Sequence, residues 1–132
     1  MALAEDSFLF SLHHISKLYH IGYTEMDWSV EILGSAEAEM DALPSGLQAR
    51  LTRLMEMVEC IGLEAMREPH VKHIDGKLWE LRAKAPEGIA RGLYVAVTGR
   101  RIVILHVFVK KSQRTPRNAL ALAYRRMNEV ET

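Results

Sequence analysis

The chain has 132 residues, of which 48% are apolar, enough for one domain around one packed core. Its single cysteine excludes an internal disulfide framework and a cysteine-based zinc cluster, and no apolar run approaches the roughly 18–20 residues of a membrane-spanning helix. Acidic residues precede any cation at the N-terminus, which argues against a signal peptide, so we expect a cytoplasmic protein.

The formal net charge of zero conceals an uneven distribution of charge. Residues 1–65 contain 3 Lys and Arg against 11 Asp and Glu, whereas residues 66–114 contain 11 against 4. A protein that binds nucleic acid needs a local basic surface rather than a high overall charge. The alternative is a solvated surface on which the basic part of the chain pairs with the acidic part.

The first 25 residues, 1–25, are predicted to be an extension to a domain that covers residues 26–132. Apolar residues recur there at helical spacing, so a short amphipathic helix is one interpretation. These residues are Phe8, Leu12, Ile15 and Tyr19. Three histidines in the same stretch lack the spacing of metal ligands on a helix, and we predict no metal site.

A strand and two helices are predicted next. Residues 27–33 alternate apolar and polar side chains, which indicates a half-buried strand that Gly34 ends. Ser35 can cap a helix over residues 36–43. After a Leu-Pro turn, apolar residues step by 4, 3, 4 and 3 positions, which predicts a second helix that ends at Gly62. The residues on its stripe are Leu47, Leu51, Leu54, Val58 and Ile61. Together the two helices form a helical hairpin.

The basic half of the chain is predicted to form strands. Residues 63–77 read as a connector, because proline, glycine and mixed charge interrupt any periodicity. Strands are predicted over residues 78–82, 89–97 and 101–109, and the last two are joined by a hairpin in which Gly99 supplies a positive φ.

A closing helix completes the predicted fold. Thr115 is a typical cap and Pro116 suits the first helical position, and one apolar stripe follows them. The order β-α-α-β-β-β-α predicts an α+β domain with a mostly antiparallel sheet. We expect the helical hairpin to pack on one face of that sheet, with the C-terminal helix after the last strand.

Period-two alternation places several cations on one face of this sheet. Arg82 points away from Trp79 and Leu81, and the last strand carries its His, Phe and Lys on the same face as Ile104. We expect the helices to cover only the more apolar face, which leaves the other face open. Candidates for the open face are Arg82, Arg91, His106, Phe108 and Lys110, with Lys111 at the strand exit.

This set of residues suits RNA cleavage, because RNA carries its own nucleophile. The reaction requires deprotonation of the 2′-OH, stabilisation of the phosphorane and protonation of the 5′-oxygen. Arginines grip phosphate oxygens in two-point geometry, and positioned cations stabilise developing charge. His106, or a lysine with a pKa lowered by other cations, can transfer protons. Phe108 or Tyr94 can stack a base.

Each of these residues also has a plainer interpretation. His106 in a central strand is either a hydrogen-bonded core residue or a catalytic one. Phe108 and Tyr94 are either core residues or platforms for bases. The basic cluster Lys110-Lys111-x-x-Arg114 either holds RNA or protects the end of a strand.

Four motifs occur in a fixed order along the chain. They are Lys72-His73, Leu78-Trp79-Glu80-Leu81-Arg82, Arg91-x-x-Tyr94 and Leu105-His106-x-Phe108-x-Lys110-Lys111-x-x-x-Thr115-Pro116. This order resembles the RelE/ParE toxin superfamily, most of all its phage-derived, HigB-like branch. The resemblance runs from about residue 28 to about residue 130.

The resemblance implies a RelE-like fold and a type II toxin: a ribosome-dependent mRNA endoribonuclease that uses no metal or cofactor and is neutralised by a helix-turn-helix antitoxin. It also implies that Arg82 and Arg91 hold the scissile phosphate and that Lys110 and Lys111 position or protonate. His106 lies where this branch keeps a histidine. Lys72 and His73 match a basic approach to the second strand and would contact RNA or the ribosome.

The same fold also serves non-enzymatic proteins, so a second hypothesis stays open. In that case the chain is a ParE-type gyrase poison or a phage-derived RNA-binding protein. The cluster of cations on one face favours the endoribonuclease.

Overall fold

The computed structural model describes residues 27–110 and 114–130. Along them lie β1 (Ser29–Ile32), α2 (Gly34–Asp41), α3 (Ser45–Ile61), a 3-10 turn (Leu63–Ala65), β2 (Val71–Asp75), β3 (Leu78–Ala85), β4 (Gly88–Val97), β5 (Arg101–Lys110) and α4 (Arg117–Met127). The predicted N-terminal helix, the predicted domain boundary and Lys111 lie outside the described residues. None of the described helices is long and apolar enough to cross a membrane.

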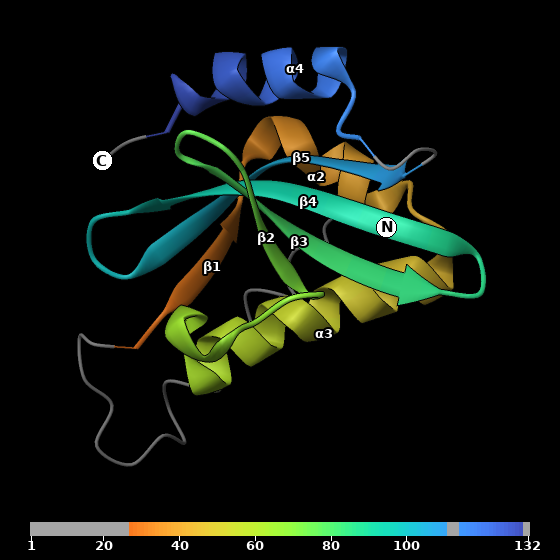
Figure 1. Ribbon diagram of the computed structural model, residues 1–132, viewed down its shortest axis with the longest axis horizontal. Helices are drawn as coiled ribbons and strands as arrows, with labels where there is room; N and C mark the ends of the chain where they lie inside the picture. The colour runs from red at the N-terminus through yellow and green to blue at the C-terminus, as the bar shows by residue number, and fades with distance from the viewer. Residues whose placement is uncertain (1–26, 111–113, 131–132) are drawn as a thin grey trace.

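The described strands form one sheet in the order β1-β5-β4-β3-β2 (Figure 1). β1 runs parallel to β5, and the other neighbouring pairs are antiparallel. The predicted α+β fold with a mostly antiparallel sheet is therefore confirmed. α3 packs on one face of the sheet and α4 on the other, so the expectation that helices cover only one face is wrong (Figure 1).

The predicted connector over residues 63–77 contains β2, an edge strand. Its burial pattern is irregular, because only Val71 is buried while Lys72, His73 and Asp75 are exposed. Its pairing with β3 also shifts register between His73 and Asp75. Edge strands are often short, charged and bulged, which blunts further pairing, and such a strand carries little of the alternation that identifies strands in a sequence.

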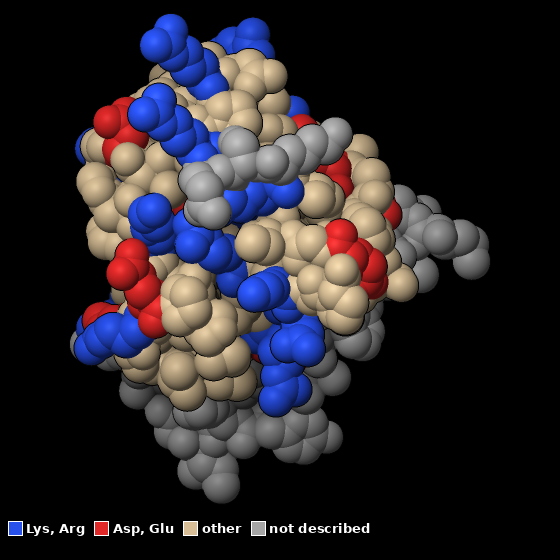
Figure 2. Space-filling model, turned by 45° about the vertical axis from the view of Figure 1, so that its right-hand side comes forward, with Lys and Arg blue, Asp and Glu red and all other residues tan. Residues whose placement is uncertain are grey.

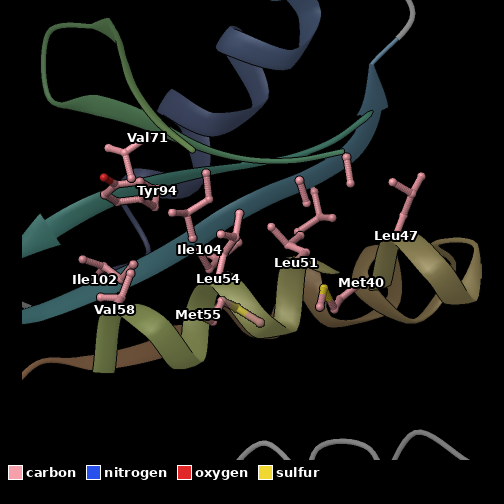
Figure 3. Packing of buried hydrophobic residues seen from close by; sticks show 14 of the residues in the cluster. Met40, Leu47, Leu51, Leu54, Met55, Val58, Val71, Tyr94, Ile102 and Ile104 are labelled. Carbon is pink, nitrogen blue, oxygen red and sulfur yellow. The ribbon is translucent and has the colours of Figure 1, made fainter. Parts of the chain in front are cut away.

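The larger core lies between α3 and the sheet, and Figure 3 shows its side chains interdigitating. Leu47, Leu51, Leu54 and Val58 are buried on the stripe predicted for α3, whereas Ile61 at the helix end is 55% exposed. Gly62 has φ 89° and ends the helix as predicted, because a side chain would strain this backbone conformation. α2 begins at Gly34 without a side-chain cap, so the predicted capping role of Ser35 is wrong.

A bulge in β5 changes which residues share a face. Leu93 pairs with His106 and Tyr94 pairs with Ile104, which leaves Leu105 as the extra residue. Ile104 consequently packs against α3, while Leu105 and Phe108 belong to the core on the α4 side. The predicted grouping of Ile104 with His106, Phe108 and Lys110 is therefore wrong. The last three do lie on the same face as Arg91, as predicted.

Replacing Leu51 with alanine should lower the free energy of unfolding by about 2–5 kcal/mol, because this fully buried side chain would leave a cavity between α3 and the sheet. Urea unfolding followed by circular dichroism measures the change. Arg53→Ala, at an exposed position of the same helix, is the control and should change it by less than about 0.5 kcal/mol. Equal effects of the two variants would contradict this account of the core.

Candidate functional site

Cross-strand register gathers five cations on the face of the sheet that α4 partly covers. Lys72 on β2 pairs with Glu80 on β3, and Arg82 on β3 pairs with Arg91 on β4. Arg91 in turn pairs with Phe108 on β5, two residues from Lys110. Lys84 lies two residues beyond Arg82 and is exposed. We call Lys72, Arg82, Lys84, Arg91 and Lys110 the cationic cluster. Figure 2 shows a band of Lys and Arg side chains over one face of the molecule.

A buried glutamate lies at the base of the cationic cluster. Glu80 is 0% exposed, and its carboxylate oxygens lie 3.1 Å from Arg82 Nε and 3.0 Å from Arg91 Nη1. Arg91 is itself only 1% exposed and also donates a hydrogen bond of 3.1 Å to Thr115 Oγ1. Arg91 therefore lies beneath the surface, and its predicted place on an open face is wrong. Thr115 holds this arginine instead of capping α4, which begins at Arg117 after Pro116.

The other members of the cationic cluster reach solvent. The Arg82 side chain is 22% exposed, and Lys72 and Lys84 are exposed. At partly exposed Lys110, burial and then the charges of Arg91 and Arg82 lower the pKa of the ammonium group. A cluster of this kind attracts a phosphate at its surface, while the buried Glu80–Arg91 pair orients the guanidinium of Arg82 from below.

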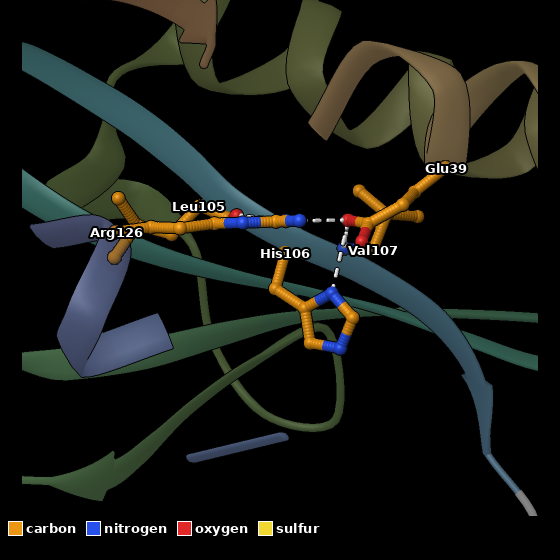
Figure 4. A network of polar contacts seen from close by, with 5 residues as sticks. All are labelled: Glu39, Leu105, His106, Val107 and Arg126. Atoms are coloured by element: carbon orange, nitrogen blue, oxygen red, sulfur yellow. Dashed lines mark hydrogen bonds and ion pairs between the residues drawn. The ribbon is translucent and has the colours of Figure 1, made fainter. Parts of the chain in front are cut away.

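His106 lies on the same face and is held by a carboxylate from α2. Its Nδ1 is 2.9 Å from Glu39 Oε1 (Figure 4). Its ring also stacks on that of Phe108, with the two centroids 4.9 Å apart. Phe108 is partly buried against the α4-side core. The interpretation of His106 as a hydrogen-bonded residue and of Phe108 as a core residue therefore holds in part. Each side chain also keeps some exposed surface.

Glu39 also completes the edge of the sheet. β1 pairs with β5 only as far as Ile104, and beyond it Glu39 Oε1 accepts the backbone N–H of Val107 at 3.1 Å. Arg126 on α4 donates to the same oxygen and to the carbonyl of Leu105, both at 2.9 Å (Figure 4). These contacts satisfy backbone groups that β1 leaves unpaired and tie α2, β5 and α4 together.

Glu39 should make the stability of the protein dependent on pH. Burial raises the pKa of its carboxyl, but hydrogen bonds from Arg126, His106 and Val107 together lower it by more. The pKa of Glu39 therefore lies below its ordinary value of 4.5. A lowered folded-state pKa gives stability that is present above the unfolded pKa and is lost as the pH falls through the folded one. The wild type should have a larger free energy of unfolding than Glu39→Gln. This difference should be complete at about pH 7 and should shrink below about pH 4.5. Urea titrations at several pH values check this, and a constant difference would contradict it.

Two other predicted residues, Tyr94 and His73, lie apart from the cationic cluster. Tyr94 is 1% exposed in the core against α3, where burial raises the pKa of its phenol, and it is not placed to stack a base. His73 pairs with Trp79 on that same side and contacts its ring at 4.9 Å. Arg114 is exposed in the segment that leads to α4.

The face covered by α3 also carries an apolar hollow of about 380 Å³, to which Trp28, Met66, Trp79 and Tyr94 contribute. It lies on the other face from the cationic cluster, and its lining includes Glu64 and Arg67 but no histidine. The hollow therefore adds nothing to the chemistry described above.

Sequence reasoning missed four residues of the site: Glu39, Glu80, Lys84 and Arg126. Glu80 and Lys84 share the alternation that identified Arg82, so the strand pattern could have found them. The contact between Glu39 and His106 spans 67 residues of sequence, and nothing in the local pattern indicates it.

Three comparisons with known proteins add to this picture. A model of a family described as phage-derived protein Gp49-like (DUF891) matches residues 38–128. No curated protein matches. The chain is similar to a protein in the toxin–antitoxin complex RelBE2 of Mycobacterium tuberculosis, with 16% identity, a TM-score of 0.48, and 65% of this chain and 94% of that chain covered. It is also similar to one in the RelE–RelB complex of Pyrococcus horikoshii OT3, with 24% identity, a TM-score of 0.47, and 64% and 96% covered.

Proposed function

Since this chain belongs to the phage-derived Gp49-like family and its motifs resemble those of RelE/ParE toxins, we propose that it is the toxin of a type II toxin–antitoxin system. Its activity is cleavage of messenger RNA on the ribosome, in the cytoplasm, without a metal ion. A helix-turn-helix antitoxin neutralises it. The observation that carries the proposal is the convergence of Lys72, Arg82 and Lys110 on the face that also carries His106.

The roles follow from exposure and charge. Arg82, partly exposed and oriented by Glu80, binds a non-bridging oxygen of the scissile phosphate. Burial and neighbouring cations lower the pKa of Lys110. Its ammonium group stabilises the phosphorane and is suited to give a proton to the 5′-oxygen. Arg91 supports both from beneath rather than touching RNA. Lys72 adds a third cation at this phosphate, and Lys84 and Arg114 extend the basic surface along the RNA backbone.

The chemistry balances without another reactant. The 2′-oxygen forms a bond to phosphorus as the bond between phosphorus and the 5′-oxygen breaks. One proton leaves the 2′-OH and one reaches the 5′-oxygen. The products are a 2′,3′-cyclic phosphate and a 5′-hydroxyl end.

Mapping RNA 5′ ends after a brief pulse of expression tests the proposal. We expect new 5′-hydroxyl ends inside translated messages, accumulating from the first minutes and absent with Arg82→Ala. The gyrase-poison alternative gives intact messages with DNA damage, and that result would contradict the proposal.

A further inference from the structure

We propose that Glu39 is a positioning residue for His106: it fixes a proton on Nδ1, so that Nε2 takes up or delivers a proton during RNA cleavage. The inference rests on the proposed function and assigns a role to a residue on α2, outside the strands that carry the cationic cluster. Glu39 acts through the imidazole and does not touch the RNA.

The carboxylate is held firmly enough to orient a ring. Oε1 of Glu39 lies 2.9 Å from His106 Nδ1, 3.1 Å from the Val107 nitrogen and 2.9 Å from Arg126 Nη1 (Figure 4). These donors come from β5 and α4, while the carboxylate comes from α2. Arg126 is further fixed by the carbonyl of Leu105. A carboxylate bound from several directions has little freedom to follow a rotating imidazole.

The contact also selects a tautomer. An ionised carboxylate only accepts hydrogen bonds, so the nitrogen that faces it must carry the proton. The lowered pKa of Glu39 keeps that carboxylate ionised at neutral pH. Phe108 stacks on the ring with an interplanar angle of 26°, which restricts rotation. In Figure 4 the other ring nitrogen points away from Glu39, which leaves Nε2 as the atom that exchanges protons.

The charges around His106 set the direction of any effect on its titration. From α2 comes Glu39, and from α4 comes Arg126 on the same oxygen. On β4, Leu93 lies opposite His106 and Arg91 lies opposite Phe108, while Lys110 is four residues along β5. The carboxylate stabilises the imidazolium and the three cations oppose it. Removing only the carboxylate charge must therefore lower the pH at which His106 titrates.

Glu39→Gln is the variant that separates positioning from structure. The amide oxygen can still accept the Val107 N–H and the Arg126 guanidinium, but the charge facing His106 is lost. The reference is His106→Gln. In a plot of cleavage rate against pH, this variant shows which limb depends on His106. The matched control is Asp41→Asn on the same helix, because two residues correspond to about 200° of rotation away from Glu39.

Two measurements test the inference. In single-turnover cleavage of ribosome-bound message, the limb of the pH profile that His106→Gln removes should move to lower pH in Glu39→Gln and should stay in place in Asp41→Asn. In ¹⁵N NMR of the free protein, His106 should carry its proton on Nδ1, and its titration in Glu39→Gln should shift the same way. The NMR result does not depend on cleavage.

The outcomes are distinct. A proton on Nε2, or an unchanged His106 titration in Glu39→Gln, overturns the inference even when wild-type cleavage is normal. An unmoved pH limb with reduced stability assigns Glu39 a structural role and also overturns it. A wild type that shows the expected NMR signature but cuts no message overturns the proposed function, while the Glu39–His106 arrangement stands.

Discussion

Arg82→Ala is expected to slow cleavage of ribosome-bound message by roughly 100-fold or more, since it removes the exposed guanidinium that meets the developing charge on phosphate. The fold should survive, because Arg82 is partly exposed and Glu80 keeps its partner Arg91. Single-turnover cleavage with purified ribosomes measures the rate, and circular dichroism checks the fold.

The matched control for Arg82 is Arg101→Ala, which removes an arginine at the start of β5. Arg101 pairs with Glu31 of β1, at the opposite edge of the sheet from β2. The Arg101→Ala substitution should leave the cleavage rate within about twofold of the wild-type rate, because a charge far from the reacting phosphate is screened. A folded Arg82→Ala variant that cuts as fast as Arg101→Ala would remove Arg82 from the site.

Glu80→Ala should cause the largest loss of stability among single changes in the cationic cluster, about 3–5 kcal/mol, because it leaves the buried guanidinium of Arg91 without its carboxylate. Urea unfolding measures this loss. Glu31→Ala, which breaks the exposed pair with Arg101, is the control and should cost less than about 1 kcal/mol.

A double variant identifies the cause of the Glu80 effect. Replacing Glu80 with leucine and Arg91 with methionine removes both buried charges and keeps apolar volume, so much of the lost stability should return. If the double variant is no more stable than Glu80→Ala, an uncompensated charge is not the reason for the loss.

The sequence predicted those parts of the fold whose pattern is local. The steps from Leu47 to Val58 indicated α3, and the alternation in β3 placed Leu81 and Arg82 on opposite faces, as the structure confirms. β2 was missed because an exposed edge strand needs little apolar alternation. The bulge at Leu105 was missed because a register shift depends on the partner strand rather than on the strand's own sequence.

The site was predictable only in part, for a related reason. Alternation could bring Arg82 and Arg91 to one face, but the burial of Arg91 depends on Glu80 across the strand pair and on Thr115 beyond the end of β5. His106 was identified by its residue type, whereas Glu39 reaches it through the packing of α2 against β5. Contacts between distant segments decide which cations face solvent, and a local pattern does not contain them.

In the proposed function, Lys72, Arg82 and Lys110 together bind one phosphodiester above the buried Glu80–Arg91 pair. A structure of the protein on a ribosome carrying a message with a 2′-O-methyl group at the cleavage site tests it most directly. We expect the adjacent phosphate to lie within hydrogen-bonding distance of the Arg82 guanidinium, with Lys110 beside it and His106 facing the sugar. A message that passes the opposite face, beside Trp79 and Tyr94, would contradict it.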